Sequence, residues 1–290
     1  MDIDLPLDDG SGRSLCLHAY TGGRPFDAAL PVVVFLHGAL NDHSVWTLAA
    51  RWCAHHGHAA LALDLPGHGR SSGPVLPDVE RLGAAVHALL RRLGVRRAAL
   101  VGHSMGSLIA LEAAATPVAP DDAAAPCIDR LVMVGTAFPM RVSPALLDGA
   151  IRQPLAAIDQ VVSFSHAGLA AQPSYPGPGS WLPGGSRALM RQVLARSHGV
   201  EGCEHNLFHH DFAACDRYTG AIEAARRLRA AGTCRSHLIL AGRDRMTAPK
   251  QAATLASELG AEVHTLARAG HFLMQDDPEG FLAALRLALR

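Results

Sequence analysis

The segment Gly102-His103-Ser104-Met105-Gly106 constrains the fold of this chain more than any other. The apolar residues 97–101 before it are typical of a buried strand, and the alanine-rich residues after Ser104 predict a helix. A serine between two glycines at this spacing is typical of a sharp strand-to-helix turn. The glycines lack the Cβ atoms that would clash in such a turn. The pattern therefore predicts an exposed serine hydroxyl, although the five residues alone also fit an ordinary small-residue turn.

Short apolar runs that end in turn residues recur along the chain and predict the strands of a sheet. In chain order they are residues 32–36, 59–63, 97–101, 131–134, 238–240 and 263–266. Apolar residues spaced three and four apart predict an amphipathic helix over 79–93, and a similar stripe predicts a closing helix over 281–289. Strands that alternate with helices indicate an α/β fold with a mostly parallel central sheet and helices on both faces.

The interval 138–220 interrupts this alternation. Its middle, 173–186, is crowded with proline and glycine, and we predict three helices around it, over 144–166, 187–197 and 206–218. A long insertion at the carboxyl edge of a parallel sheet is where a lid is expected. We therefore expect residues 1–137 and 221–290 to form an α/β core, and 138–220 to form a mobile helical lid or cap that sets the preferred chain length of the substrate.

Charge and hydropathy argue against several classes of protein. The chain has 26 Lys and Arg residues and 26 Asp and Glu residues, for a formal net charge of zero, whereas nucleic acids and anionic membranes favour a basic surface. No apolar stretch reaches the length of a membrane span, and the N-terminal residues 1–5 are acidic, unlike a signal peptide. We expect a soluble cytoplasmic protein that binds neither nucleic acid nor membrane. The sequence gives no indication of the oligomeric state.

Ser104 needs a base before it can attack a carbonyl carbon, because its hydroxyl is protonated near neutral pH. Imidazole suits that role, and it needs an acceptor on its far nitrogen to fix its tautomer and stabilise its charged form. Asp244 follows the apolar run 238–241, and His271 lies between the last predicted strand and the closing helix. Both residues are therefore expected on loops at the edge of the sheet that holds Ser104, in the order serine, acid, histidine.

Five segments, in this order, resemble the α/β-hydrolase fold superfamily, and in particular its serine esterase-like branch with a helical cap. The segments are His37-Gly38, Asp64-Leu65-Pro66-Gly67-His68-Gly69-Arg70-Ser71, Gly102-His103-Ser104-Met105-Gly106, Gly242-Arg243-Asp244 and Gly270-His271-Phe272. The resemblance covers most of the chain except the predicted lid.

The resemblance implies a catalytic triad and an oxyanion hole. Ser104 would be the nucleophile, His271 the base and then the acid, and Asp244 the residue that orients His271. The backbone amides of Met105 and Ala39 would bind the oxyanion, and one such donor is worth roughly 3 kcal/mol of activation barrier.

Other polar residues near these segments receive a structural interpretation. We expect bracing or turn-stabilising roles, rather than proton transfer, for His37, Asp64 and His68. His103 is expected to point away from Ser104, because neighbouring side chains diverge at the start of a helix. Asp276 and Asp277 follow His271 closely and are expected to start the closing helix. Some members of the superfamily carry their acid after the strand corresponding to 131–134. Residues 135–138 contain no carboxylate here, which favours Asp244.

The predicted lid contains two groups of residues with open interpretations. The first could supply part of a metal site, but it forms no complete ligand set by spacing: Cys203, Glu204, His205, His209, His210, Asp211 and Cys215. Hydrolysis by a serine needs no ion, so we expect neither a metal nor a cofactor. The second could line an apolar substrate pocket or form the core of the lid: Phe138, Met140, Phe164, Trp181, Leu207, Phe208 and Phe212.

The sequence thus predicts a serine hydrolase that cleaves a small-to-medium carboxylic ester through an acyl-enzyme intermediate. The same triad would serve a lactonase, a carbon–carbon bond hydrolase, a thioesterase or a cofactor-free haloperoxidase-like perhydrolase, and these alternatives stay open. An epoxide hydrolase or haloalkane dehalogenase is disfavoured, because the resemblance places a carboxylate at position 104 in such enzymes. A non-catalytic ligand-binding receptor on the same fold is the alternative from another class.

Overall fold

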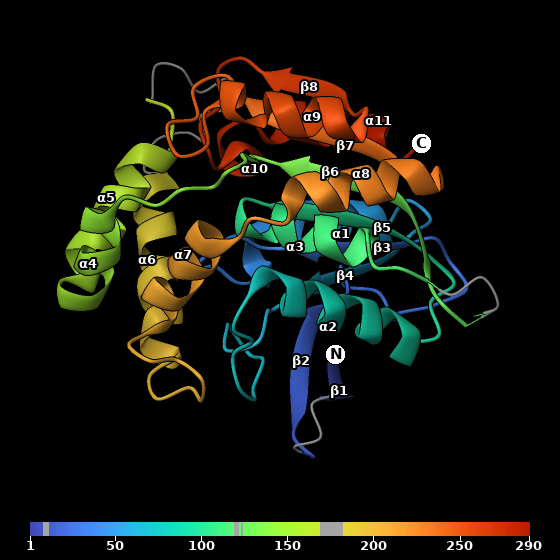
Figure 1. The fold of residues 1–290 in the computed structure, drawn as a ribbon, viewed down its shortest axis with the longest axis horizontal. Helices are drawn as coiled ribbons and strands as arrows, with labels where there is room; N and C mark the ends of the chain where they lie inside the picture. The colour runs from blue at the N-terminus through green and yellow to red at the C-terminus, as the bar shows by residue number, and fades with distance from the viewer. Residues whose placement is uncertain (8–11, 119–121, 123, 169–181) are drawn as a thin grey trace.

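A sheet of eight strands forms the centre of the computed structural model, which describes residues 1–7, 12–118, 122, 124–168 and 182–290 (Figure 1). The strand order is β1-β2-β4-β3-β5-β6-β7-β8. Strand β2 is antiparallel to β1 and β4, whereas β3 to β8 are parallel. The strands are β1 (Asp2–Pro6), β2 (Ser14–Tyr20), β3 (Val32–Leu36), β4 (Ala59–Leu63), β5 (Arg97–His103), β6 (Cys127–Val134), β7 (Arg235–Ala241) and β8 (Glu262–Leu266).

Helices cover both faces of this sheet. One face packs against α2 (Val79–Arg92), α3 (Met105–Ala114), α8 (Ala221–Ala231) and α9 (Ala253–Leu259). The other face packs against α1 (Thr47–Ala54) and α11 (Pro278–Ala288). Every residue of β3 and β4 is buried, as expected for parallel strands covered on both sides. The predicted α/β fold is confirmed.

A third group of helices lies beside the sheet: α4 (Pro144–Arg152), α5 (Pro154–Ser165), α6 (Leu182–Arg196) and α7 (Leu207–Arg217). Figure 1 shows them gathered at one end of the sheet, on the left of the view. They share a separate apolar cluster that includes Ile158, Met190 and Phe208, and Leu40 from the loop after β3 joins it. The rest of the described structure consists of the short helices η1 (His43–Trp46), η3 (Pro249–Ala252) and α10 (Leu273–Asp276) with the connecting loops.

The secondary structure differs from the sequence prediction at the first two strands and at one helix. Strands β1 and β2 were not among the predicted strands, although Ile3 and Leu5 alternate with aspartates in the period-two pattern of a half-buried strand. The predicted single helix over 144–166 is wrong, because it consists of two helices that meet at Gln153 and Pro154. Proline has no N–H to continue a helix, and it disfavours helical angles in the residue before it. Gln153 accordingly has φ −141° and ψ 58°.

Residues 169–181, which include Trp181 and most of the proline- and glycine-rich stretch 173–186, lie outside the described residues. The mobility expected for a lid therefore stays a prediction. No helix in the described part of the chain has both the length and the apolar character needed to cross a bilayer.

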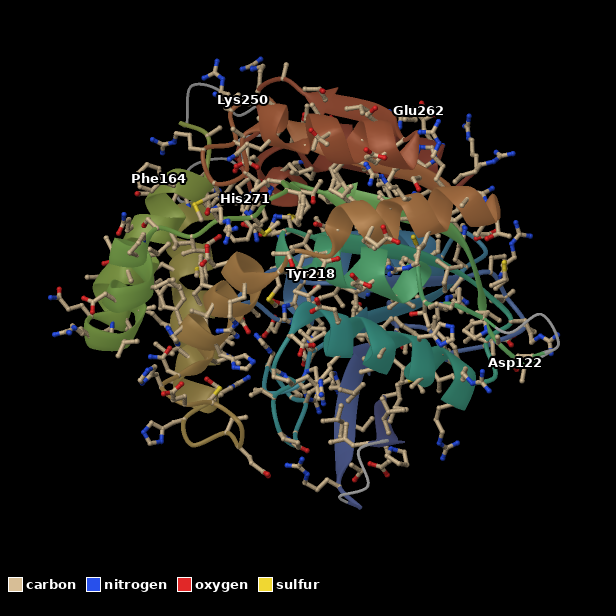
Figure 2. All side chains as sticks on the ribbon, viewed as in Figure 1. Asp122, Phe164, Tyr218, Lys250, Glu262 and His271 are labelled. Carbon is tan, nitrogen blue, oxygen red and sulfur yellow. The ribbon has the colours of Figure 1, made fainter. Side chains whose placement is uncertain are left out.

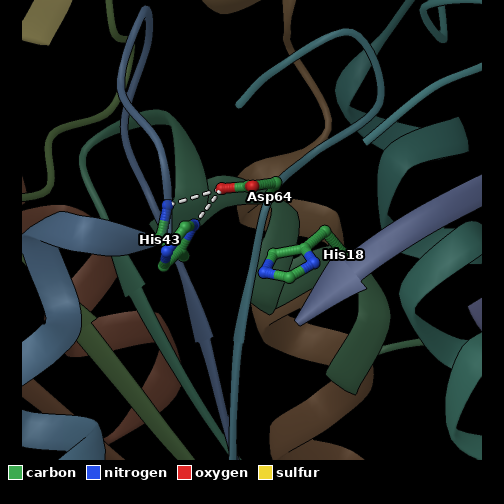
Figure 3. Close-up of side chains that lie close together, drawn as sticks. All are labelled: His18, His43 and Asp64. Carbon is green, nitrogen blue, oxygen red and sulfur yellow. Dashed lines mark hydrogen bonds and ion pairs between the residues drawn. The ribbon is translucent and has the colours of Figure 1, made fainter. Parts of the chain in front are cut away.

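Asp64 holds together the loops that follow β3 and β4. Its Oδ1 accepts hydrogen bonds from the backbone N–H of His43 at 2.7 Å and from His43 Nδ1 at 2.8 Å, and its Oδ2 accepts the N–H of Arg70 at 2.8 Å. Figure 3 shows the two bonds from His43, with His18 alongside. A Cβ at position 69 would lie 2.3 Å from Asp64 Oδ2, so only glycine fits there. The structural role expected for Asp64 is confirmed.

We predict that Asp64→Asn lowers the free energy of unfolding at pH 7 by roughly 2 to 4 kcal/mol, because a buried carboxylate that accepts several N–H groups is removed. Burial alone raises the pKa of Asp64, but the bonds from His43 and Arg70 outweigh it and lower the pKa to about 2. Since the unfolded value is near 3.9, this contribution is present above pH ~4 and is lost as the pH falls toward 2.

Urea unfolding between pH 3 and pH 7 measures this effect. Asp27→Asn is the matched control, since the exposed carboxylate of Asp27 accepts only the N–H of Ala29 among the described residues, and it should change the free energy of unfolding by less than about 0.5 kcal/mol. Equal destabilisation by the two variants would contradict the role of Asp64.

Candidate active site

Ser104 occupies a strained turn between β5 and α3. Its backbone angles are φ 51° and ψ −120°, a conformation that costs a non-glycine residue of order 1–3 kcal/mol. A Cβ on Gly102 would lie 2.0 Å from the carbonyl oxygen of Gly106, and a Cβ on Gly106 would lie 2.3 Å from that of Leu36. The two glycines are therefore needed because α3 begins in contact with the backbone of β3 and β5. This is the turn that the sequence predicted.

His271 and Asp244 are brought together from separate loops. The Nδ1–H of His271 donates to Asp244 Oδ2 at 2.8 Å, and both side chains are almost fully buried. Asp244 Oδ1 accepts the backbone N–H groups of Met246 and Thr247, each at 2.8 Å. Burial raises the pKa of Asp244, but His271 and Thr247 outweigh it, so the pKa lies below its ordinary value and the carboxylate is ionised.

Thr247 is a third member of this cluster, and the sequence analysis did not select it. Its hydroxyl lies 2.7 Å from Asp244 Oδ2, 2.9 Å from the carbonyl oxygen of Gly135 and 3.0 Å from His271 Nδ1. A hydroxyl has one proton, which it donates to Gly135 or Asp244, and its lone pairs face the N–H of His271. A threonine three residues after an aspartate fits a side-chain-stabilised turn, which is the signal that could have identified it.

A cavity of about 250 Å³ opens above Ser104, and Ser104, His271 and Thr247 line it. Figure 2 labels His271 and Phe164 at this end of the sheet, where α5 lies. No hydrogen bond joins the Ser104 hydroxyl to His271 within the described residues. Catalytic hydrogen bonds in free enzymes are often long and tighten only when substrate is bound. The structure thus pairs the predicted base with the predicted acid and places the serine at the same cavity.

Two backbone amides have no acceptor among the described residues: that of Ala39, which lines the cavity, and that of Met105, which follows Ser104 in the chain. Ala39 lies in a turn closed by a bond from Asn41 N–H to the carbonyl of Gly38 at 3.3 Å, and Met105 is the first residue of α3. Among the described residues, neither the N–H of Ala39 nor that of Met105 donates a hydrogen bond. The first N–H groups of a helix have no partner inside the helix, and they form a natural site for negative charge.

Two buried histidines beside the cavity are held neutral by their surroundings. His37 Nε2 accepts the N–H of Leu65 at 3.1 Å, so the ring proton is on Nδ1, which donates to the carbonyl of Gly38 at 2.8 Å. His103 Nε2 donates to the carbonyl of His271 at 3.0 Å. Burial lowers the pKa of His37 to about 4 and that of His103 to about 3. The expectation that His37 braces the site rather than transfers protons fits these bonds.

The loop that carries His271 is fixed by Asp276, which corrects one prediction. Asp277 caps α11 as expected by accepting the N–H of Gly280 at 3.0 Å. Asp276 does not start that helix. It is fully buried, and its Oδ2 accepts the N–H of Gly270 at 2.9 Å and that of Ala167 at 2.8 Å. It therefore ties the His271 loop to the end of α5.

The walls of the cavity come from the core and from α4 to α7. Of the aromatic and aliphatic residues considered from the sequence, Met140, Phe164 and Phe212 line it. Leu207 and Phe208 are instead buried in the apolar cluster of those helices, and Phe138 packs edge-on against Tyr218 at 6.1 Å between ring centroids. Of the two roles left open by the sequence, some of these residues thus line the pocket and others form the core of the helices around it.

Two of the seven possible metal-site residues of the predicted lid have other hydrogen-bond partners. Asp211 bonds to His68, and His210 Nε2 bonds to the carbonyl of Leu76 at 2.9 Å. Two other groups in the described chain bring potential ligands together, His18 with His43 and Asp64, and His237 with Glu262 and His264. Both oxygens of Asp64 already accept N–H groups. The facing nitrogens of His237 and His264 are 3.4 Å apart with ring planes 16° apart, which suits a bond between the two rings.

The fold and the residues at the carboxyl edge of its sheet define an α/β hydrolase. The family model described as "Alpha/beta hydrolase family" matches residues 33–284, and the chain belongs to this family. Solved structures agree over nearly the whole chain. An esterase from Exiguobacterium antarcticum has a TM-score of 0.75 at 15% identity and covers 99% of this chain and 98% of its own. The enol-lactonase from Burkholderia xenovorans LB400 has a TM-score of 0.73 at 21% identity, covering 96% and 97%. At these identities the likeness shows the fold alone.

Curated relatives match shorter segments. The 2-succinyl-6-hydroxy-2,4-cyclohexadiene-1-carboxylate synthase of Serratia proteamaculans (strain 568) is 36% identical over 85 residues, which is 29% of this chain and 32% of that protein. The sn-1-specific diacylglycerol lipase ABHD11 of Mus musculus is 32% identical over 144 residues, 49% of this chain and 44% of that protein. The chain thus spans less than half the length of these relatives.

We predict that His37 and His103 stay neutral between pH 8 and pH 5, because their pKa values are about 4 and about 3. Long-range ¹H–¹⁵N NMR of the histidine rings measures this directly, and the variants His37→Gln and His103→Gln assign the two signals. Each ring should keep the shifts of a single neutral tautomer. Titration of either ring near pH 6.5, the value of an unperturbed histidine, would contradict the bonding described here.

Proposed function

We propose that this protein is a serine hydrolase that cleaves carboxylic esters through an acyl-enzyme. The observation that carries the proposal is the buried Asp244–His271 pair, which lies at the same cavity as a serine on a strained strand-to-helix turn. Membership of the family supports a hydrolase. The names of its relatives include an esterase, a lipase and an enol-lactonase, which supports ester and lactone chemistry.

In the proposed mechanism, His271 Nε2 removes the proton of Ser104 as the serine oxygen attacks the ester carbonyl. The hydrogen bond to Asp244 keeps the proton of the neutral ring on Nδ1 and stabilises the imidazolium that forms. The amides of Ala39 and Met105 would bind the oxyanion. His271 then protonates the leaving alcohol. In the second half of the reaction it activates a water molecule, which releases the acid and restores Ser104.

The same proposal assigns residues 1–137 and 221–290 to the catalytic core and 138–220 to a cap. Support comes from the separate apolar cluster of α4 to α7 and from the cavity residues these helices supply, such as Gln160 and Met190. Because one wall of the cavity belongs to the cap, its side chains would set the preferred length of the acyl or alcohol group.

We predict that Ser104→Ala abolishes hydrolysis of short-chain p-nitrophenyl esters, with a loss in kcat of about 10⁴-fold or more, because no acyl-enzyme can form. Release of p-nitrophenol measures the rate, and circular dichroism checks the fold. Ser107→Ala is the matched control, since Ser107 lies one turn along α3 and bonds to Thr136 and to the carbonyl of Ser104. Equal rates for Ser104→Ala and the parent protein would overturn the proposal.

The charge of the cavity favours a substrate with an acidic group. Arg141 and Arg245 line it, and within the described residues no Asp or Glu side chain does. Arg245 lies 4.9 Å from the centre of the Phe164 ring and donates to the carbonyl of Ser163. Arg141 donates to the carbonyl of Asp216 and lies 4.0 Å from its carboxylate, so Arg245 is the less compensated of the two charges. Each guanidinium has five N–H groups, so donors are left for a carboxylate. We therefore include esters whose acyl part ends in a carboxylate among the proposed substrates.

We predict that Arg245→Gln lowers kcat/KM for mono-p-nitrophenyl glutarate about fivefold, the equivalent of ~1 kcal/mol for a partly exposed ion pair. Hydrolysis of p-nitrophenyl pentanoate, a neutral ester of the same acyl length, should change less than about twofold. Arg243→Gln is the control, because exposed Arg243 lies two residues before Arg245 but does not line the cavity. An equal effect of Arg245→Gln on the two esters would contradict the role of charge.

A further inference from the structure

Asp211 of α7 links the predicted cap to the loop that contains Ala39. Its Oδ2 accepts two hydrogen bonds of 2.8 Å each, one from the backbone N–H of Leu40 and one from His68 Nε2. The side chains of Asp211 and His68 are 4% and 2% exposed, so this pair is shielded from water. A single buried oxygen thus joins three segments that are distant in the sequence.

The bonds around His68 define the charge of this pair. Its Nδ1 lies 3.1 Å from the carbonyl oxygen of Pro66, which can only accept, so Nδ1 carries a proton. Its Nε2 faces Asp211 Oδ2, which already accepts the N–H of Leu40, so this nitrogen also carries a proton. Burial alone lowers the pKa of His68, but attraction to Asp211 outweighs it and the pKa is raised. The pair is therefore an imidazolium and a carboxylate.

Leu40 is held in an uncommon conformation by this contact. It has φ 53°, one of two positive values for non-glycine residues in the described chain, and the other is that of Ser104. Its side chain is fully buried in the apolar cluster with Phe208 of α7. The bond from the Leu40 N–H to Asp211 fixes the orientation of the Ala39–Leu40 peptide unit, and the Cα of Ala39 joins this unit to the one that carries the Ala39 N–H. The direction of the Ala39 N–H depends on the same short turn.

We propose that Asp211, with His68 as its charged partner, is a positioning residue that aims the Ala39 amide at the oxyanion. This inference rests on the proposed function and adds to it a direct dependence of the oxyanion hole on helix α7. The oxyanion exists only during acyl transfer, so correct aim of the amide stabilises the transition state and leaves the bound ester unaffected. Loss of the pair should therefore lower kcat and leave KM unchanged.

Asp211→Asn tests the charge while it preserves the shape of the side chain. Without a carboxylate, buried His68 loses one proton, and the bond to Pro66 keeps the remaining proton on Nδ1. Nε2 then becomes an acceptor facing the amide of the asparagine. If the amide NH₂ of the asparagine turns toward His68, the N–H of Leu40 loses its acceptor. If the amide oxygen stays there instead, it faces His68 Nε2, which is also an acceptor. We expect kcat to fall about tenfold or more, part of the loss that accompanies removal of an oxyanion donor.

Asp216→Asn is the matched control. Asp216 lies on the same helix and its carboxylate also accepts a backbone N–H, that of Val142 at 2.9 Å, but it has no contact with the loop after β3. We expect its kcat and KM on a neutral p-nitrophenyl ester to stay within about twofold of the parent protein. The second readout is inhibition by an alkyl boronic acid, which forms a tetrahedral anion on the serine. Its affinity should fall in Asp211→Asn by the same factor as kcat, and it should be unchanged in Asp216→Asn.

His68→Gln provides an independent variant if Asp211→Asn does not fold. Glutamine can donate to Asp211 but carries no charge, so a smaller loss of kcat with unchanged KM is expected. A normal kcat and boronate affinity in folded Asp211→Asn or His68→Gln would overturn the inference, even if the melting temperature falls. Equal losses in Asp211→Asn and Asp216→Asn would also overturn it. Ser104→Ala distinguishes failure of the proposed function from failure of this inference alone. If that variant hydrolyses the ester as fast as the parent, the serine mechanism and this inference fail together.

Discussion

The strained turn at Ser104 is the constraint on which the rest of the site depends. The backbone of α3 approaches β3 and β5 so closely that a Cβ on Gly102 or Gly106 would lie 2.0 or 2.3 Å from a carbonyl oxygen. This contact forces Ser104 to φ 51°. As a result Ser104 lines the cavity, and the first free amide of α3 follows it directly in the chain. The packing of the sheet offsets this strain, since β3 is buried along its whole length.

Buried carboxylates hold the loops around this turn. Asp64 fixes the segments after β3 and β4, Asp211 fixes Leu40, and Asp276 fixes the loop before His271. Asp244 organises its own turn before it contacts His271. Each of these acids accepts at least one backbone N–H, so each helps to determine the path of the main chain in its loop. The carboxyl edge of the sheet is thus a set of loops whose positions depend on buried charge.

Much of the arrangement could be predicted from the sequence where the signal is local. The six apolar runs gave the parallel strands, and the serine between glycines gave the turn. The order of Asp244 and His271 after Ser104 placed both on loops at one edge, where the structure joins them by a bond of 2.8 Å. Strands β1 and β2 were missed because their alternating pattern is weak over five and seven residues. Thr247 was missed although its spacing from Asp244 is a turn signal. The roles of Asp211 and Asp276 were missed for a different reason: they come from contacts between distant segments, which spacing does not record.

The most direct test of the account is covalent labelling of the protein with an alkyl fluorophosphonate, which reacts with a serine activated by a nearby base. Intact mass spectrometry counts the adducts and peptide sequencing locates them. The account predicts one adduct per chain, on Ser104, and its loss in Ser104→Ala. An unlabelled protein, or an adduct on any other residue while Ser104 stays free, would contradict it.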